Sequence, residues 1–79
     1  MDKRTIGILG LGVFGRSIIN TLRKYNCDII AVDDHDDVIN HFEPVLARGV
    51  VGDITDYDLL QAAGIDTCDT VVVATGDNL

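Results

Sequence analysis

The sequence is poor in basic residues. Its 79 residues include six Lys and Arg against 13 Asp and Glu, which gives a formal net charge of −7. Binding to the phosphate backbone of a nucleic acid needs a clustered basic face, and an anionic membrane surface selects for basic residues in the same way. The composition therefore argues against both kinds of partner.

Long apolar stretches are also missing. Apolar residues make up 47% of the chain, but they fall in short runs separated by Gly and Asp. A membrane-spanning helix needs about 20 apolar residues, and residues 1–5 lead directly into an apolar run without the pattern of a signal peptide. We expect no membrane insertion and one small core, since a domain of this length buries about 60% of its unfolded surface.

Cysteine is scarce. Cys27 and Cys68 each precede an apolar run, and no histidine lies at metal-ligand spacing from either. If those runs are strands that flank a common central strand, the two Cα atoms lie about 10 Å apart, at roughly 4.8 Å per strand. A disulfide needs less than about 7 Å. We therefore expect two reduced structural thiols in a cytoplasmic protein, with no metal site.

What the sequence does contain is an alternation of β-branched runs with helical patterns, which is typical of parallel βαβ units. Strands are predicted at residues 5–9, 28–32, 48–52 and 70–74. Helical patterns lie between them, at 13–25, in a short segment that ends at Pro44, and from 55 to 63. The predicted fold is α/β, with a doubly wound parallel sheet in strand order 3-2-1-4, truncated after the fourth strand, in one domain over residues 1–79.

The apolar spacing predicts which face of the first helix is buried. Phe14, Ile18, Leu22 and Tyr25 recur at helical intervals, so we expect all four on the face that packs against the sheet. The polar residues between them, Arg16 among them, are expected in solvent.

Capping signals mark the ends of the later helices. Asp34 is placed to cap the second helix, with Asp37 in its first turn. Residues 55–58 have the Thr-x-x-Asp form of a capping box, which predicts that Thr55 caps the third helix. Gly64 is placed to end that helix.

A glycine-rich loop follows the first strand. Residues 10–15 read Gly-Leu-Gly-Val-Phe-Gly, a G-x-G-x-x-G pattern that opens a helix. Gly10 permits the tight turn, Gly12 lets a diphosphate approach the backbone, and Gly15 lets the helix pack closely on the strand. The helix N-terminus favours an anion there. The motif is a more specific indication of nucleotide binding because it lies between a predicted strand and an amphipathic helix.

An acidic residue follows the second strand at the spacing of a dinucleotide-binding fingerprint. Asp33 lies 21 residues after Gly12, where a carboxylate accepts hydrogen bonds from the ribose of adenosine. The alternative is that Asp33 caps the second helix, but Asp34 is equally placed to cap and would leave Asp33 free. Carboxylates at 33, 34, 36 and 37 would repel a 2′-phosphate, which favours NAD over NADP. Together these features predict a Rossmann-like nucleotide-binding fold.

The remaining strand ends offer further ligand contacts. Asp53 and Ile54 follow the third strand, where a carboxylate can accept from the adenine amino group and an apolar side chain can touch the ring. The alternative for Asp53 is an ordinary turn acid. Thr75 and Gly76 follow the fourth strand and face the glycine loop across the predicted crevice, unless they form an ordinary loop.

The motifs combine into a family resemblance. They are Gly-Leu-Gly-Val-Phe-Gly at 10–15, Val-Asp-Asp at 32–34, Val-Val-Gly-Asp-Ile-Thr-Asp at 50–56, Ala-Ala-Gly-Ile at 62–65 and Val-Val-Val-Ala-Thr-Gly-Asp at 71–77. The chain resembles, over nearly its whole length, the N-terminal nucleotide-binding part of RCK (regulator of potassium conductance) or TrkA-N domains. These domains belong to the Trk and Ktr potassium uptake systems.

The resemblance implies a cytoplasmic regulator that binds NAD or NADH, or alternatively ATP or ADP. It would pass the bound state to a membrane-embedded potassium channel or transporter subunit, and it would not be an enzyme. The nucleotide-contacting positions implied by the matched motifs are Gly10, Leu11, Gly12, Val13, Phe14, Gly15, Asp33, Asp34, Asp53, Ile54, Thr75 and Gly76.

One departure from the family pattern concerns phosphate binding. Many members of the resembled family carry Arg at the position held here by Val13, where a guanidinium reaches the terminal phosphate of ATP. Arg16 lies close enough in sequence to compensate, although a solvent-facing helix position is the other interpretation.

Two other classes of function compete with regulation. The first is an NAD-dependent oxidoreductase whose catalytic part lies elsewhere, but the chain has no Tyr four residues before a Lys, and His35 and His41 fall on the adenosine side as surface residues. The second is an interaction module that binds no nucleotide, which the intact glycine loop opposes.

The predicted sheet leaves an apolar edge. In strand order 3-2-1-4, residues 70–74 form an outer strand of Thr, Val and Ala without protecting charge. Such an edge pairs readily with another strand. We expect a homo-oligomer, or a chain that is a fragment of a longer domain.

Overall fold

A computed structural model describes residues 3–74 of the chain. The strands are β1 (Arg4–Leu9), β2 (Cys27–Asp33), β3 (Arg48–Val51) and β4 (Thr70–Val73). The helices are α1 (Val13–Leu22), α2 (Asp36–Phe42) and α3 (Tyr57–Ala63), with 3-10 turns at Glu43–Val45 and Ile65–Thr67. No helix in this part of the chain is long and apolar enough to span a membrane.

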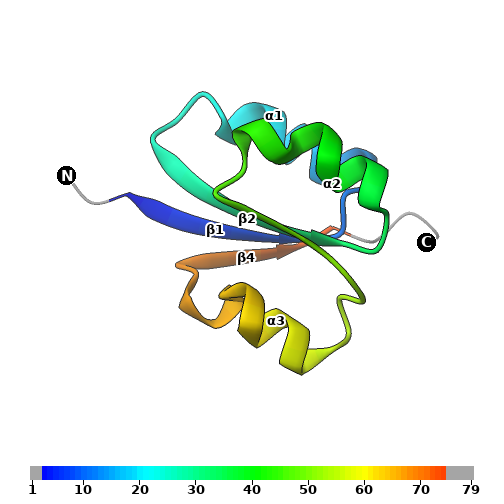
Figure 1. Ribbon diagram of the computed structural model, residues 1–79. Coiled ribbons are helices and arrows are strands. Elements are labelled where there is room, and N and C mark those ends of the chain that lie inside the picture. The colour runs from blue at the N-terminus through cyan, green and yellow to red at the C-terminus, as the bar shows by residue number, and fades with distance from the viewer. Residues whose placement is uncertain (1–2, 75–79) are drawn as a thin grey trace.

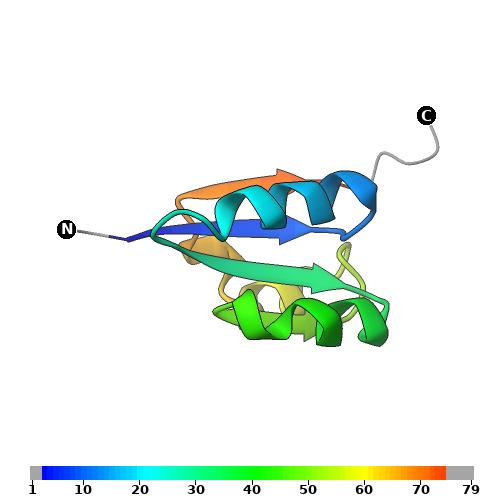
Figure 2. The same cartoon turned by 90° about the horizontal axis from the view of Figure 1, so that it is seen from above.

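The strands form one parallel sheet in the order β3-β2-β1-β4. Helices α1 and α2 cover one face of the sheet and α3 covers the other (Figure 1). Seen from above in Figure 2, the strands point the same way, so their carboxyl ends meet at one edge. The predicted Rossmann-like α/β fold with strand order 3-2-1-4 is confirmed, and each predicted strand agrees with the observed one to within a residue at either end.

Two apolar clusters pack on the two faces of the sheet, because the central strands β1 and β2 send alternate side chains to each. Under α1 and α2, Ile8 and Ile29 of the sheet meet Ile19 and Ile39 of the helices. On the face of α3 the cluster consists of Leu9, Ile30, Val32, Ala63 and Ile65. Cys27 packs against the first cluster and Cys68 against the second, so the two free thiols lie on opposite faces.

The predicted buried face of α1 is wrong in two of its four residues. Phe14 is 63% exposed and Tyr25 is 66% exposed. Helix α1 is instead buried through Gly15 and Ile19, one turn apart, and it ends at Leu22. Because Gly15 lacks a side chain, α1 closely approaches the Gly10 carbonyl and Ala74 along that row, and the neighbouring Phe14 lies on the exposed side. Tyr25 lies beyond the helix and no longer shares its periodicity.

Both predicted N-caps are also wrong. Helix α2 begins after His35, and neither that residue nor Asp34 makes a side-chain cap. Helix α3 begins one residue later than predicted, after Asp56, whose Oδ1 accepts from the Leu59 N–H at 3.2 Å. Thr55 is unavailable as a cap because its hydroxyl donates to Asp53 Oδ1 at 2.7 Å. The hydrogen bond of the Thr55 hydroxyl to Asp53 competes with capping, and the N-cap is Asp56, one residue later.

The prediction that Gly64 ends α3 is confirmed. Gly64 has a φ of 90° and caps the helix in the left-handed conformation, and its N–H donates to Gln61 O at 3.1 Å. A side chain is strained at such a φ, so glycine suits the position.

Replacing the cap of α3 tests the corrected helix start. Asp56→Ala is expected to lower the free energy of unfolding by about 1 kcal/mol, the usual cost of losing an N-cap acceptor. Thr55→Ala is the matched control, and should cost less than about 0.5 kcal/mol because its hydroxyl lies in an exposed turn. Urea unfolding followed by circular dichroism measures both. A larger loss at Thr55 than at Asp56 would contradict the observed helix start.

The outer strand β4 carries exposed apolar side chains. Val71 is 41% exposed and Val73 is 64% exposed. Within the described residues, β4 pairs only with β1. The apolar edge expected from the sequence is therefore present at this strand.

Candidate functional site

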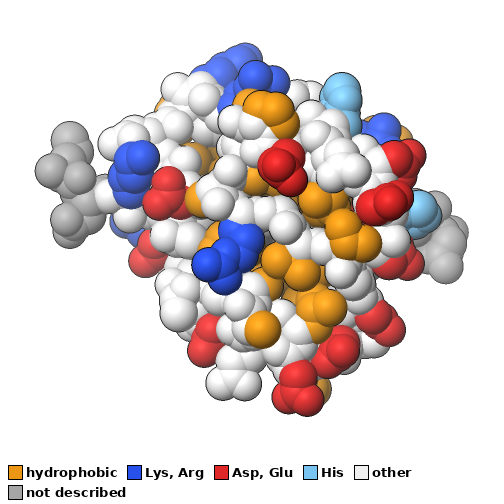
Figure 3. Space-filling view, in the orientation of Figure 1, with side chains coloured by type: hydrophobic (Ala, Val, Ile, Leu, Met, Phe, Trp, Pro, Cys, Tyr) orange, Lys and Arg blue, Asp and Glu red, His pale blue; other side chains and the backbone are white. Residues whose placement is uncertain are grey.

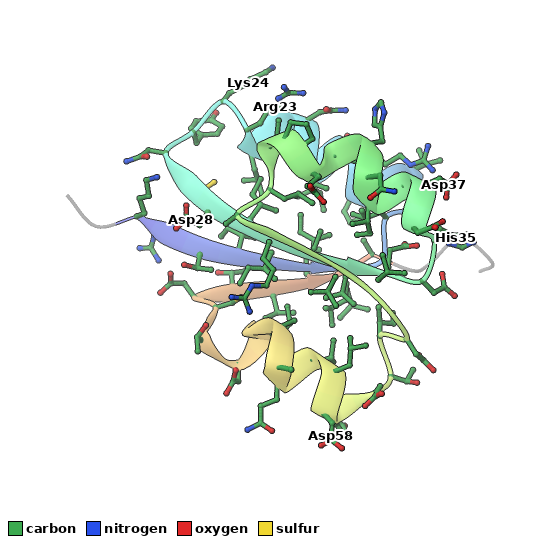
Figure 4. The ribbon with its side chains drawn as sticks, in the orientation of Figure 1. Arg23, Lys24, Asp28, His35, Asp37 and Asp58 are labelled. Carbon is green, nitrogen blue, oxygen red and sulfur yellow. The ribbon has the colours of Figure 1, made fainter. Side chains whose placement is uncertain are left out.

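The loops at the carboxyl ends of β1 and β2 surround a cavity of about 400 Å³. In Figure 4, His35 and Asp37 lie at this edge of the sheet, while Arg23 and Lys24 lie at the far end of the α1 and α2 layer. The residues that line the cavity are Gly10, Leu11, Gly12, Arg16, Asp33, Asp34, His35, Asp37, Val38 and Ala74. The glycine loop, the end of β2 and the first turns of α1 and α2 thus meet around one space.

The glycine loop is held in place by the fold at two of its three glycines. Gly10 has a φ of 95°, and its N–H donates to Val32 O at 2.8 Å. A Cβ on Gly15 would overlap the carbonyl oxygen of Gly10, so only glycine permits this approach of helix to loop. A Cβ on Gly12 would meet nothing closer than Ala74 O at 3.8 Å, an ordinary contact. The packing of the described residues therefore gives no reason for a glycine at position 12.

Asp33 joins the glycine loop to the turn that precedes α2. Asp33 is 8% exposed, and its Oδ2 accepts from the Leu11 N–H at 2.6 Å. Its Oδ1 accepts from the His35 N–H at 2.8 Å. The expectation that Asp34 caps α2 and leaves Asp33 free is wrong, because both oxygens of Asp33 already accept protein hydrogen bonds. The carboxylate sets the position of the loop.

The His35 ring lies between two carboxylates. Its Nδ1 is 2.9 Å from Asp33 Oδ1 and 2.8 Å from Asp34 Oδ1, although the side chain is 70% exposed. The hydrogen bond to Asp33 and the charge of Asp34 raise the pKa of His35 above its ordinary value. Burial raises the pKa of Asp33, but hydrogen bonds from Leu11 and His35 outweigh it and hold that pKa below its ordinary value.

These three residues also resemble a metal-binding group. Asp33, Asp34 and His35 bring one ligand atom each within 4.8 Å of one another. His35 Nδ1 lies against both carboxylates, a position in which a protonated ring nitrogen donates to them. A nitrogen that donates a proton has no lone pair for a metal. We therefore assign the group to hydrogen bonding.

A smaller cavity of about 160 Å³ adjoins the first on the side of β3. It shares Gly10, Asp33 and Asp34 with the larger cavity, and Gly52, Asp53 and Ile54 complete its lining. Asp53 Oδ1 accepts from the Thr55 N–H at 2.8 Å, and the Thr55 backbone and hydroxyl donors hold the pKa of Asp53 below its ordinary value. The carboxylate at the end of β3 is therefore ionised and fixed in orientation.

Of the other predicted site residues, some lie away from both cavities and some lie outside the described residues. Val13 and Phe14, in the first turn of α1, are 87% and 63% exposed and line neither of these cavities. Thr75 and Gly76 lie outside the described residues, although Ala74, which precedes them, lines the larger cavity.

Sequence reasoning underestimated Arg16 and His35. His35 is exposed, as expected, but it precedes α2 instead of lying on it, and its Nδ1 is 2.9 Å from Asp33 Oδ1. Its position two residues after Asp33 is the spacing at which an Asp side chain bonds a backbone N–H, and this was the available signal. Arg16 lines the cavity and its Nε donates to Leu11 O at 3.1 Å. His41, by contrast, stacks edge-on against Phe42.

The parallel sheet, the glycine loop and the acid at the end of β2 define a Rossmann-like α/β domain. A model of the TrkA-N domain family matches residues 6–78. The chain belongs to the TrkA-N domain family, as the motifs in its sequence implied.

Individual relatives agree with this assignment. The chain is 34% identical over 77 residues to Ktr system potassium uptake protein C of Bacillus subtilis, covering 98% of the chain and 35% of that protein. It is 29% identical over 79 residues to Ktr system potassium uptake protein A of the same organism, covering 100% of the chain and 36% of that protein. The chain thus spans about a third of the length of these relatives.

A solved structure confirms the fold independently. N5-carboxyaminoimidazole synthetase from Staphylococcus aureus, solved in complex with ADP, superposes with a TM-score of 0.72 at 23% identity. The match covers 89% of this chain and 18% of the synthetase. At that identity the likeness concerns the fold alone.

Proposed function

We propose that this domain binds an adenine nucleotide, NAD(H) or ATP/ADP, at the glycine loop and thereby regulates a potassium uptake system. The observation that carries the proposal is the open side of Gly12. Two loop glycines are explained by the turn and by helix packing, whereas Gly12 faces the larger cavity with no internal constraint. A phosphate group approaching the backbone is a reason for glycine at this position.

The diphosphate in this proposal lies over the glycine loop at the start of α1. The first N–H groups of a helix have no partner within the helix, and their dipole favours an anion. Helix α1 has Gly12 as its N-cap, with no side chain to satisfy those groups. The phosphate oxygens would accept from these N–H groups.

The adenosine lies on the acidic side. Asp33 and Asp34 border both cavities, which is where ribose hydroxyls would donate to carboxylates. Adenine would enter the smaller cavity, with Asp53 as acceptor for its amino group and Ile54 against the ring. The acidic side chains at 33, 34, 36 and 37 disfavour the extra phosphate of NADP. Figure 3 shows acidic side chains gathered at the end of the molecule where α2 begins.

The regulatory role is supported by the relatives. Both Bacillus subtilis proteins are named as components of a Ktr potassium uptake system. By this proposal the domain acts in the cytoplasm, held near the membrane by a potassium channel or transporter subunit. By the same proposal it is not an enzyme, since these relatives are named as potassium uptake proteins.

The edge of β4 is the proposed route to assembly. Val71 and Val73 are exposed, and no strand among residues 3–74 pairs with the outer side of β4. We propose that this edge is paired either by further chain of the same domain, of which residues 1–79 would be the N-terminal part, or by a second copy.

Regulation requires two conformations that the ligand distinguishes, because a ligand shifts an equilibrium only by its difference in affinity for the two states. The glycine loop and the turn before α2 are joined through Asp33, so a nucleotide bound to both would fix their separation. A partner that contacts this edge of the sheet would then sense the bound state.

Calorimetric titration of the purified protein with NAD, NADH, ATP and ADP tests the proposal. At least one of these nucleotides is expected to bind with a dissociation constant below about 1 mM, roughly −4 kcal/mol. Adenosine should bind more weakly, because it lacks the phosphates. The absence of binding by all four would overturn the nucleotide assignment. Turnover of NADH, followed by its absorbance in the same samples, would favour an oxidoreductase.

A further inference from the structure

One basic side chain lies among the carboxylates that line the larger cavity. Of the described residues, Arg16 is the one Lys or Arg in the lining, alongside Asp33, Asp34 and Asp37. The charge of His35 is offset by the two carboxylates that hold its ring. Arg16 is therefore the group in this lining that most favours an anionic ligand.

The guanidinium of Arg16 is anchored at one edge. Its Nε donates to Leu11 O at 3.1 Å, which joins the side chain to the glycine loop itself. Within the described part of the chain, neither Nη group hydrogen-bonds to the protein, and no carboxylate lies within 4.0 Å to form an ion pair. The anchoring bond leaves the N–H groups of both Nη atoms available to a ligand.

A structural role explains this arrangement poorly. An arginine that served only to balance charge would pair with one of the neighbouring carboxylates, because that contact is electrostatically the most favourable one. Arg16 instead bonds a neutral carbonyl of the loop that surrounds the proposed phosphate position. The planar guanidinium offers two parallel donors, which match the oxygens of a phosphate group.

We propose that Arg16 recognises a phosphate group of the nucleotide, with its Nη groups donating to phosphate oxygens beside the glycine loop. This inference rests on the proposed nucleotide site and adds the residue that distinguishes a phosphorylated adenine ligand from adenosine. The cavity without Arg16 has the negative side chains of Asp33, Asp34 and Asp37 around its lining. Removing the guanidinium therefore both deletes donors and leaves the carboxylates to repel the ligand.

Titration of ADP and adenosine into matched variants tests the inference. Arg16→Ala is expected to weaken ADP binding by about tenfold or more, and adenosine binding by less than about twofold. Arg16→Gln keeps most of the stem and one donor for Leu11 O, and should weaken ADP binding to a similar extent. Arg23→Ala is the control, because Arg23 caps the far end of the same helix and faces solvent (Figure 4). It should bind ADP as the unmodified protein does.

The outcomes separate the two proposals. Equal ADP affinity in the unmodified protein and in a folded Arg16→Gln variant overturns the role of Arg16 and leaves the nucleotide site intact. An equal loss of ADP and adenosine affinity also overturns it, since Arg16 would then support the site rather than read the phosphate. If the unmodified protein binds no adenine ligand, the proposed function fails and this inference fails with it. Circular dichroism establishes that each variant is folded.

Discussion

Gly12→Ala is expected to weaken nucleotide binding while the protein stays folded, and Gly15→Ala is expected to destabilise the fold itself. At Gly12 an added Cβ meets only Ala74 O at 3.8 Å, so the protein can accommodate it. The same Cβ would stand where a phosphate approaches the loop. At Gly15 the added atom would overlap the carbonyl oxygen of Gly10, which is backbone and cannot rotate away.

The expected sizes follow from these contacts. Gly12→Ala should change the free energy of unfolding by less than about 1 kcal/mol, since the N-cap preference for Gly opposes the lower entropy of the unfolded chain with Ala. Its nucleotide affinity should fall by about tenfold or more, equivalent to roughly 1.4 kcal/mol. Gly15→Ala should cost about 3 kcal/mol, at the upper end for overpacking, because helix and loop must separate.

Urea unfolding and calorimetric titration on the same preparations measure both quantities. Normal nucleotide affinity in Gly12→Ala would show that no phosphate lies against the loop. A Gly15→Ala protein as stable as the unmodified one would contradict the close packing of α1 on the glycine loop.

Asp33→Ala is expected to lower both stability and nucleotide affinity. The substitution leaves the buried Leu11 N–H without its acceptor at 2.6 Å, which costs about 1–3 kcal/mol. Nucleotide affinity should fall by about tenfold or more, because the glycine loop loses its anchor and the ribose loses a carboxylate. Asp34→Ala is the matched control, since Asp34 is exposed and contacts only the His35 ring among the interactions of the described residues. Its stability should change by less than about 0.5 kcal/mol.

The same carboxylate determines a pH dependence of stability. Asp33 has a pKa lowered in the folded state, so its contribution is present above the ordinary value of 3.8 and is lost as the pH falls through the lowered pKa. His35 has a raised pKa, so its contribution is fully present below 6.5 and is lost as the pH rises through the raised pKa. Stability from this pair should therefore be highest between these two ordinary values.

Unfolding midpoints in urea, recorded from acid to mildly alkaline pH, check this dependence. In His35→Ala the decline on the alkaline side should be reduced, while the decline on the acidic side should persist through the Leu11 hydrogen bond to Asp33. An unchanged alkaline decline in His35→Ala would mean that another group is responsible. Nucleotide affinity unaffected by Asp33→Ala would refute the ribose assignment, whatever the stability result.

The order of the elements and the location of the candidate site follow from local patterns in the sequence. Alternating β-branched and helical patterns are local properties, and each strand was predicted to within a residue. The glycine loop and the spacing of Asp33 likewise depend on neighbours in sequence, because the loop joins consecutive elements. Gly64 was recognisable as a helix end for the same reason, since a φ of 90° is a local requirement.

The contacts that those residues make depend on the packing of the folded domain. Periodicity placed Phe14 and Tyr25 inward, but α1 is buried through Gly15 and Ile19 instead. Capping patterns favoured Thr55, whereas a competing hydrogen bond to Asp53 moved the cap to Asp56.

The partners of Asp33 show the same limit of sequence reasoning most clearly. Its Oδ2 accepts from the N–H of Leu11, 22 residues away, between the ends of the neighbouring strands β1 and β2. Arg16 enters the same cavity from α1, beside residues of α2 that are distant in sequence. Each of these contacts is a choice among competing donors, acceptors and packing faces. A pattern of residue types cannot resolve that choice, because it depends on which groups folding brings within hydrogen-bond distance.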